Sequence, residues 1–90
     1  MVVGRLSRRA RRAERAAAEF GADAGAALDL LELTELAWHD CYGEESPSDE
    51  VIDDIFVVAQ GSMADLTRAA RLAVEDFRDL RLQADDLRSG

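Results

Sequence analysis

Apolar residues near the end of the chain alternate at steps of three and four, the spacing of one face of an α-helix. This stripe consists of Met63, Leu66, Ala70, Ala73, Phe77, Leu80, Ala84 and Leu87. Charged residues fill the other side, and Ser62 with Asp65 three positions later resembles a capping box. The pattern predicts one amphipathic helix over about 62–87, with the a/d heptad of a coiled coil.

A similar stripe runs through the first half of the chain and predicts a second long helix over about 5–42. Its members are Leu6, Ala10, Ala13, Ala17, Phe20, Ala24, Ala27, Leu31, Thr34, Trp38 and Cys41. Gly21 and Gly25 each cost about 1 kcal/mol relative to Ala in a helix interior, so the alternative is a break near Gly21–Gly25. Gly43 ends the helix, with Trp38 and Tyr42 expected to point inward.

A shorter helix is predicted over about 47–60. Ser46 and Pro47 suit its N-cap and first turn, and Gly61 suits its end. Its broad apolar face consists of Val51, Ile52, Ile55, Phe56, Val58 and Ala59. A strand over 55–59 is the rival interpretation, but no strand partner lies nearby in the sequence. We therefore expect a single all-α domain over 1–90, an antiparallel hairpin of the two long helices with the short one packed across them.

The net charge of −8 conceals two opposite regions. Residues 1–15 hold six arginines and one acid, whereas residues 16–90 hold five arginines and 18 acids. The six are Arg5, Arg8, Arg9, Arg11, Arg12 and Arg15. Their mutual repulsion predicts an Arg-rich arm or weak helix over 1–19 that needs an anionic neighbour. That neighbour is the chain's own acidic body, an acidic partner protein or nucleic acid.

Amino-acid composition indicates the source and the cellular compartment of the protein. The chain has no Lys or Asn but 16 Ala, which fits GC-rich coding and predicts a bacterial, specifically actinobacterial, source. One cysteine, Cys41, fits a reducing cytoplasm. No apolar run approaches the ~20 residues of a membrane span, and no apolar segment follows the arginines as a secretory signal requires. We therefore expect a cytoplasmic protein without a membrane partner.

Candidate chemistry is sparse. His39 shares a polar helix face with Glu32 and Glu35, but a di-iron bundle needs Glu-x-x-His on two helices, and this chain has one histidine. Cys41 is expected to face the apolar stripe, about 200° around the helix from His39. Phosphate-binding and dinucleotide fingerprints are missing from the sequence. The chain is predicted not to be an enzyme and to use no metal, cofactor or small molecule, with metal binding as a minor alternative.

Five apolar residues fall outside the stripes and form the candidate protein interface. They are Leu33, Leu36, Val57, Leu72 and Leu82. Together with the heptad they favour a homodimer or a helical partner. The leading hypothesis is a non-catalytic protein–protein interaction module, such as a small adaptor, regulator or assembly subunit. The alternative is a nucleic-acid-associated regulator or antitoxin that uses the Arg-rich arm.

Overall fold

The chain folds into helices alone in the computed structural model, which describes residues 2–90, with side chains described from residue 4. The elements are α1 (Val2–Phe20), the short 3-10 turn η1 (Gly21–Asp23), α2 (Ala24–Tyr42), α3 (Asp49–Ala59) and α4 (Met63–Ser89). Strands are absent from residues 2–90. The prediction of an all-α bundle is confirmed.

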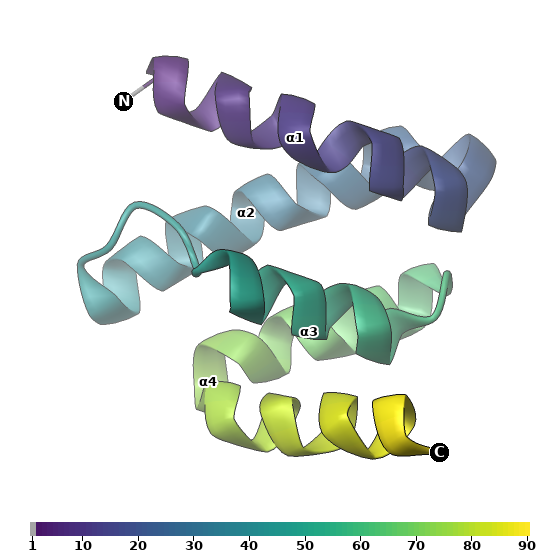
Figure 1. Cartoon of the computed structure of the whole chain (residues 1–90). Coiled ribbons are helices and arrows are strands. Elements are labelled where there is room, and N and C mark those ends of the chain that lie inside the picture. The colour runs from purple at the N-terminus through teal and green to yellow at the C-terminus, as the bar shows by residue number, and fades with distance from the viewer. Residues whose placement is uncertain (1) are drawn as a thin grey trace.

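The first long helix breaks where its glycines predicted. Gly21 has φ 53°, a left-handed conformation that Gly adopts at little cost, and the 3-10 turn that it begins reverses the chain. α2 therefore runs antiparallel to α1 and lies behind it (Figure 1). A continuous helix over 5–42 is wrong, and the alternative with a break near Gly21–Gly25 is the one observed.

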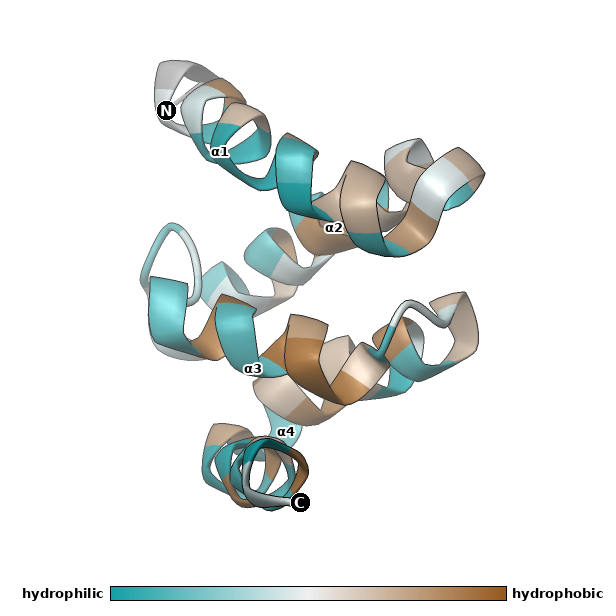
Figure 2. Ribbon diagram, turned by 45° about the vertical axis from the view of Figure 1, so that its right-hand side comes forward, coloured by the Kyte–Doolittle hydropathy of each residue, from teal (hydrophilic) through white to brown (hydrophobic). Residues whose placement is uncertain are grey.

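The inward face of α1 differs from the predicted stripe. Leu6, Ala10 and Ala17 are exposed, whereas Arg12 and Ala16 are buried. The side chains of α1 that meet the body are largely arginines, which bind carboxylates of α2 and α3. Figure 2 shows hydrophilic segments along α1 and, below it, α3, whose ribbon alternates hydrophilic with strongly hydrophobic segments. Phe20 of the predicted stripe is buried and Ala13 packs against the core, so the arginine ion pairs and these apolar contacts together set the rotation of this helix about its axis.

α3 begins two residues later than predicted. Ser48 is its N-cap, and its Oγ accepts a hydrogen bond from Val51 N at 3.3 Å. Pro47 precedes the cap and is buried, so it does not occupy the first turn as expected. At the other end, Gln60 and Gly61 both have positive φ, 48° and 76°, which turns the chain sharply into α4.

α4 bends in the middle, so the continuous 62–87 helix is wrong in that respect. Asp76 has non-helical backbone angles (φ −160°, ψ 87°), and its Oδ1 accepts hydrogen bonds from Arg78 N and Asp79 N. The carboxylate acts as the N-cap of the second half of α4. The two halves fold back on each other on either side of Asp76 (Figure 1). The apolar stripe survives this bend, because Leu66, Ala73 and Leu80 are all buried.

The helices stack as two hairpins, α1 with α2 and α3 with α4. The expected hairpin of two long helices with a short one across it is therefore wrong: α3 lies in the middle of the molecule and packs mainly on both halves of α4. The core gathers around Ile55 and Phe56 of α3, against Leu31 of α2 and Leu66 of α4. This arrangement brings the end of α2, the start of α3 and the bend of α4 together at one end of the molecule.

Candidate functional site

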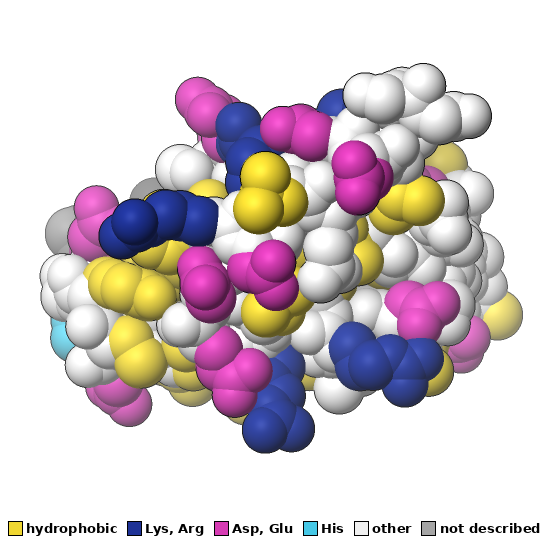
Figure 3. All heavy atoms as spheres, turned by 90° about the horizontal axis from the view of Figure 1, so that it is seen from below, with side chains coloured by type: hydrophobic (Ala, Val, Ile, Leu, Met, Phe, Trp, Pro, Cys, Tyr) yellow, Lys and Arg dark blue, Asp and Glu magenta, His cyan; other side chains and the backbone are white. Residues whose placement is uncertain are grey.

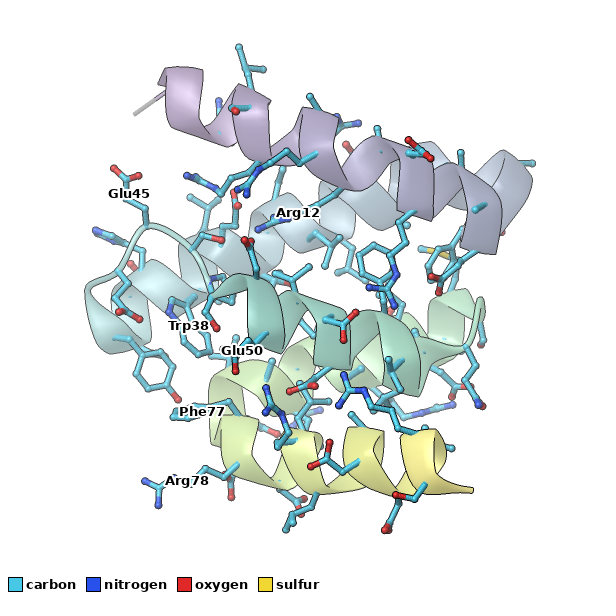
Figure 4. The ribbon with its side chains drawn as sticks, in the orientation of Figure 1. Arg12, Trp38, Glu45, Glu50, Phe77 and Arg78 are labelled. Carbon is cyan, nitrogen blue, oxygen red and sulfur yellow. The ribbon has the colours of Figure 1, made fainter. Side chains whose placement is uncertain are left out.

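The arginines of α1 bind the chain's own acidic side chains. Arg8 Nε donates to Glu35 Oε2 at 2.6 Å, and Arg12 Nη1 donates to the same oxygen at 2.9 Å. Arg12 also donates to Ser46 Oγ at 3.1 Å. Glu35 and Arg12 have side chains only 4 % and 8 % exposed. This buried group joins α1 and α2 to the loop before α3, and Figure 4 shows Arg12 beneath α1.

Three more arginines of α1 are paired at its surface. Arg9 meets Asp29 and Glu32 of α2, Arg11 meets Asp49 of α3, and Arg15 meets Glu19 and Asp53. Arg5 makes no ion pair within residues 4–90 and lies in a hollow beside Leu36 and His39. Five of the six candidate anionic-partner contacts are therefore engaged within the chain.

The ionisation of Glu35 reflects this environment. Burial acts to raise the pKa of its carboxyl. The hydrogen bond from Arg8, the charge of Arg12 and the Ser46 hydroxyl outweigh burial, so the pKa lies below the ordinary 4.5. Burial in turn lowers the pKa of Arg12 against the opposing effect of Glu35. Glu35 is thus held as an anion by two guanidinium groups. Its carboxylate is therefore already engaged and is not free to act as a metal ligand.

A second ion-pair group fixes the C-terminal half of α4 to α3. Asp54 is 1 % exposed and accepts hydrogen bonds from Arg81 Nε and Arg88 Nη2, each at 2.7 Å. Arg81 also reaches Glu50, and Arg88 reaches Asp53. The hydrogen bond to Asp54 raises the pKa of both arginines. These contacts hold the groove described below in one shape.

Three aromatic side chains meet at the bend of α4. Trp38 and Tyr42 of α2 have ring centroids 4.3 Å apart, and Phe77 of α4 lies 5.7 Å from Trp38 and 5.9 Å from Tyr42. Trp38 is buried, but Tyr42 is 40 % exposed and Cys41 is also exposed. The expectations that Tyr42 and Cys41 face inward are therefore wrong.

Tyr42 also stabilises the bend itself. Within a straight helix the carbonyl of Val74 accepts a hydrogen bond from the amide of Arg78. Here that amide donates to Asp76 instead, and the Tyr42 hydroxyl donates to Val74 O at 2.8 Å. Both backbone groups released by the bend thus have a new side-chain partner.

Two adjoining open hollows flank Phe77, and we call them together the bend groove. The first, about 510 Å³, is lined by Ser48, Glu50, Val51, Asp54, Phe77, Arg78, Arg81 and Leu82. The second, about 540 Å³, is lined by Tyr42, Glu75, Asp76, Phe77, Arg78, Asp79 and Leu82. Figure 3 shows hydrophobic side chains gathered at the histidine-bearing end of the lower face, with acidic ones beside them. The bend groove thus offers an apolar floor with a charged rim.

The predicted interface residues are not brought together. Leu82 is 67 % exposed and lines the bend groove. Leu33 and Leu36, 62 % and 58 % exposed, lie on α2 and do not line it. Val57 is half-buried, and Leu72 packs partly against the core. The homodimer that these residues suggested stays a prediction.

The main residues of the bend groove were missed because they fell within apolar stripes. Val51 was assigned to an apolar face and is buried in the core as predicted, but it also lines the groove. Phe77 was assigned to the core and packs only partly against it, and Tyr42 was expected inward. One signal was present: Asp76 with Asp79 repeats the spacing of Ser62 with Asp65, which caps the start of α4. Such a pattern permits a break inside a predicted helix without requiring one, since Asp29 and Glu32 have the same spacing within the unbroken α2.

The three residues weighed for the minor metal-binding alternative, Glu32, Glu35 and His39, do not assemble into a site. Glu32 pairs with Arg9, and Glu35 pairs with Arg8 and Arg12. His39 Nδ1 lies 3.9 Å from Asp40 Oδ1. In the described part of the chain, no three His, Cys, Asp or Glu side chains gather as a metal site. Nor does any helix there have the length and apolar character to cross a membrane.

The chain matches no known protein family, no curated protein and no solved structure. Its function is therefore inferred from its own geometry.

Proposed function

We propose that this chain is a non-catalytic helical interaction module that binds another protein through the bend groove. The observation that carries this proposal is Leu82, an exposed leucine beside the half-buried ring of Phe77 and the exposed Tyr42. Apolar surface of this kind, rimmed by charged groups, is typical of protein-binding sites.

The groove is also held in shape before any partner arrives. Asp54 binds two arginines of α4, Asp76 caps the second half of that helix, and Tyr42 closes the bend. A preorganised surface loses less conformational entropy on binding than a mobile one. The position of Leu82 therefore supports recognition by a defined partner.

The charge of the groove favours a different protein over a second copy. Its Tyr42 side carries Glu75, Asp76 and Asp79 against Arg78 alone. The whole chain carries a net charge of −8, so two copies repel each other. Binding to nucleic acid through α1 is less well supported, because phosphates would have to replace carboxylates at five arginines.

The test compares the wild-type chain with a groove variant and a matched surface variant in a nuclease-treated lysate of the native host. Leu82→Glu places a charge in the groove, and Leu33→Glu makes the same change at an equally exposed leucine of α2. We expect one protein to be retained by wild type and Leu33→Glu but lost with Leu82→Glu. Equal retention by all three, or no retained protein, contradicts the proposal. Sedimentation equilibrium tests for self-association. If wild type is a dimer and Leu82→Glu is a monomer, the groove binds a second copy of this chain and not a different protein.

A further inference from the structure

We infer that the occupant of the bend groove is a basic amphipathic helix of the partner, with large apolar residues along one face and Arg or Lys beside them. This inference rests on the proposed function and adds the chemistry of the partner. Helices commonly bind in this way, with apolar side chains in a groove and charged ones at its rim.

The floor of the groove suits the apolar face of such a helix. Val51 from α3 and Phe77 with Leu82 from α4 line one hollow, and Tyr42 extends this surface past the bend. Figure 4 shows Phe77 at the bend of α4, below Trp38 of α2 and Glu50 of α3. A leucine or phenylalanine placed beside Phe77 buries apolar surface on both sides.

The rim supplies negative charge that the chain does not neutralise itself. Asp76 and Asp79 have no arginine partner within residues 4–90, and Glu75 is paired only with the exposed Arg71. Glu50 and Asp54 at the other end already bind Arg81. The acids of the groove that no arginine of residues 4–90 pairs with are therefore Asp76, which also caps the second half of α4, and Asp79. Both lie on the Tyr42 side of the groove, where cations of a partner helix are favoured.

The molecule already binds one arginine-rich helix internally through its own carboxylates. α1 is an arginine-rich helix whose cations meet carboxylates of α2 and α3, with only small apolar residues and Phe20 packed beneath it. α1 is tethered, so it needs little apolar area to stay bound. A helix from another protein lacks that tether and needs the larger apolar contact that the bend groove provides.

Substitution of Arg78 should change the affinity for a basic helix in a predictable direction. It lies on the shared wall of both hollows, makes no ion pair in the described part of the chain, and has its guanidinium 5.9 Å from the Phe77 ring centroid. In Figure 4 its side chain points away from the body of the molecule. Because this cation repels a basic helix, Arg78→Gln is expected to strengthen binding of such a helix and weaken binding of an acidic one.

The experiment measures fluorescence anisotropy with three labelled helical peptides of about 18 residues, long enough to be partly helical alone. One has a leucine stripe flanked by arginines, the second has the same stripe flanked by glutamates, and the third has an alanine stripe flanked by arginines. We expect the Leu/Arg peptide to bind at least about tenfold more tightly than either of the others.

Two pairs of variants then locate the binding site. Asp79→Arg reverses a charge in the groove, and Asp86→Arg makes the same change at an exposed acid of α4 that does not line it. We expect Asp79→Arg to weaken the Leu/Arg peptide by about tenfold and Asp86→Arg by less than about twofold. Leu82→Glu is expected to abolish binding and Leu33→Glu to preserve it. Circular dichroism confirms that each variant is folded.

The outcomes separate this inference from the proposed function. Equal or tighter binding of the Leu/Glu peptide, or no binding of any peptide, overturns the partner chemistry. Equal effects of Asp79→Arg and Asp86→Arg overturn the location. In each case the proposed function still stands if a protein from the lysate is lost with Leu82→Glu, and it fails independently if none is.

Discussion

The carboxylate of Glu35 accepts hydrogen bonds from Arg8 and Arg12 at a position that is only 4 % exposed. Two cations of α1 thus share one anion of α2, with the Ser46 hydroxyl alongside. Removing one partner of a buried ion pair is costly because the other charge stays out of water without compensation.

We therefore expect Glu35→Gln to lower the free energy of unfolding by about 3 kcal/mol, since Arg12 remains buried without a counter-charge. Urea unfolding followed by circular dichroism measures this change. Glu14→Gln is the control, because Glu14 is exposed and makes no ion pair within residues 4–90; we expect a change under about 0.5 kcal/mol. Equal stability of the two variants contradicts a structural role for Glu35.

Two glycines are expected to respond to alanine with opposite signs. A Cβ at Gly61 would lie 2.7 Å from Glu19 O of α1, and its φ of 76° strains any other residue. Gly25 lies within α2 with nothing within 4 Å of such a Cβ. We expect Gly61→Ala to destabilise the protein by about 2 kcal/mol and Gly25→Ala to stabilise it by about 0.5 kcal/mol. Thermal unfolding of both variants tests this, and stabilisation by Gly61→Ala contradicts it.

At the scale of the element, α4 is two helices with one apolar face. Asp76 stops the first half and caps the second, while Leu66 and Leu80 stay on the buried side. The bend exposes the surface around Phe77 on which the proposed binding site depends.

Asp76→Ala removes the cap and is expected to destabilise the second half of α4 by about 1 kcal/mol. Native-state hydrogen exchange should show faster exchange at the amides of Arg78 and Asp79, which lose their acceptor. Asp86→Ala in the same half should leave both amides unchanged. Unchanged exchange in Asp76→Ala means that the carboxylate does not maintain the bend.

α1 is held to the body mainly by charge, so its docking should depend on salt. At about 1 M salt the Debye length falls to about 3 Å, which screens exposed pairs such as Arg9 with Asp29. We expect amide protection in α1 to decrease with added salt more than protection in α3, whose acids are also paired with arginines but which in addition buries a broad apolar face in the core. Parallel changes in α1 and α3 would show that apolar packing, and not charge, docks α1.

At the scale of the whole molecule, the ion pairs make stability depend on pH. The pKa of Glu35 lies below its ordinary value of 4.5, as explained above, and that of Asp53 below 3.8. For Asp53 the hydrogen bond from Arg15 is the largest cause; burial opposes it, and Arg88 adds to the lowering. Both groups are therefore more acidic in the folded chain than in the unfolded one.

A carboxyl with a lowered folded pKa stabilises the protein above its unfolded pKa, and that contribution is lost as pH falls through the folded pKa. We expect the free energy of unfolding to be steady near neutral pH and to decrease as pH falls from about 4.5. Urea unfolding at a series of pH values measures the slope. Glu35→Gln should show a shallower slope than wild type below that point, and an equal slope contradicts the assignment.

The sequence alone determined the features that depend on near neighbours. The helical spacing, the Ser62 cap and the Gly43 stop predicted where most helices lie, because such signals act within a few residues. The apolar stripe of α4 was also correct, with five of its eight members buried. The need of the Arg-rich segment for an anionic neighbour followed from its charges, although its identity was left open.

The tertiary structure decided what depends on residues far apart in the chain. Arg12 and Glu35 are 23 residues apart, and their pairing turned the arginine face of α1 inward against the predicted stripe. Asp76 carried a local capping signal, but an unbroken heptad suited a straight helix equally well. The bent form is the one in which Tyr42 of α2 donates a hydrogen bond to the carbonyl of Val74. Contacts between helices thus select one of the conformations that local propensity allows. The bend groove depends on the same contact between α2 and α4, which the sequence pattern does not reveal. This is why Leu82 alone of the five predicted interface residues lies in the groove.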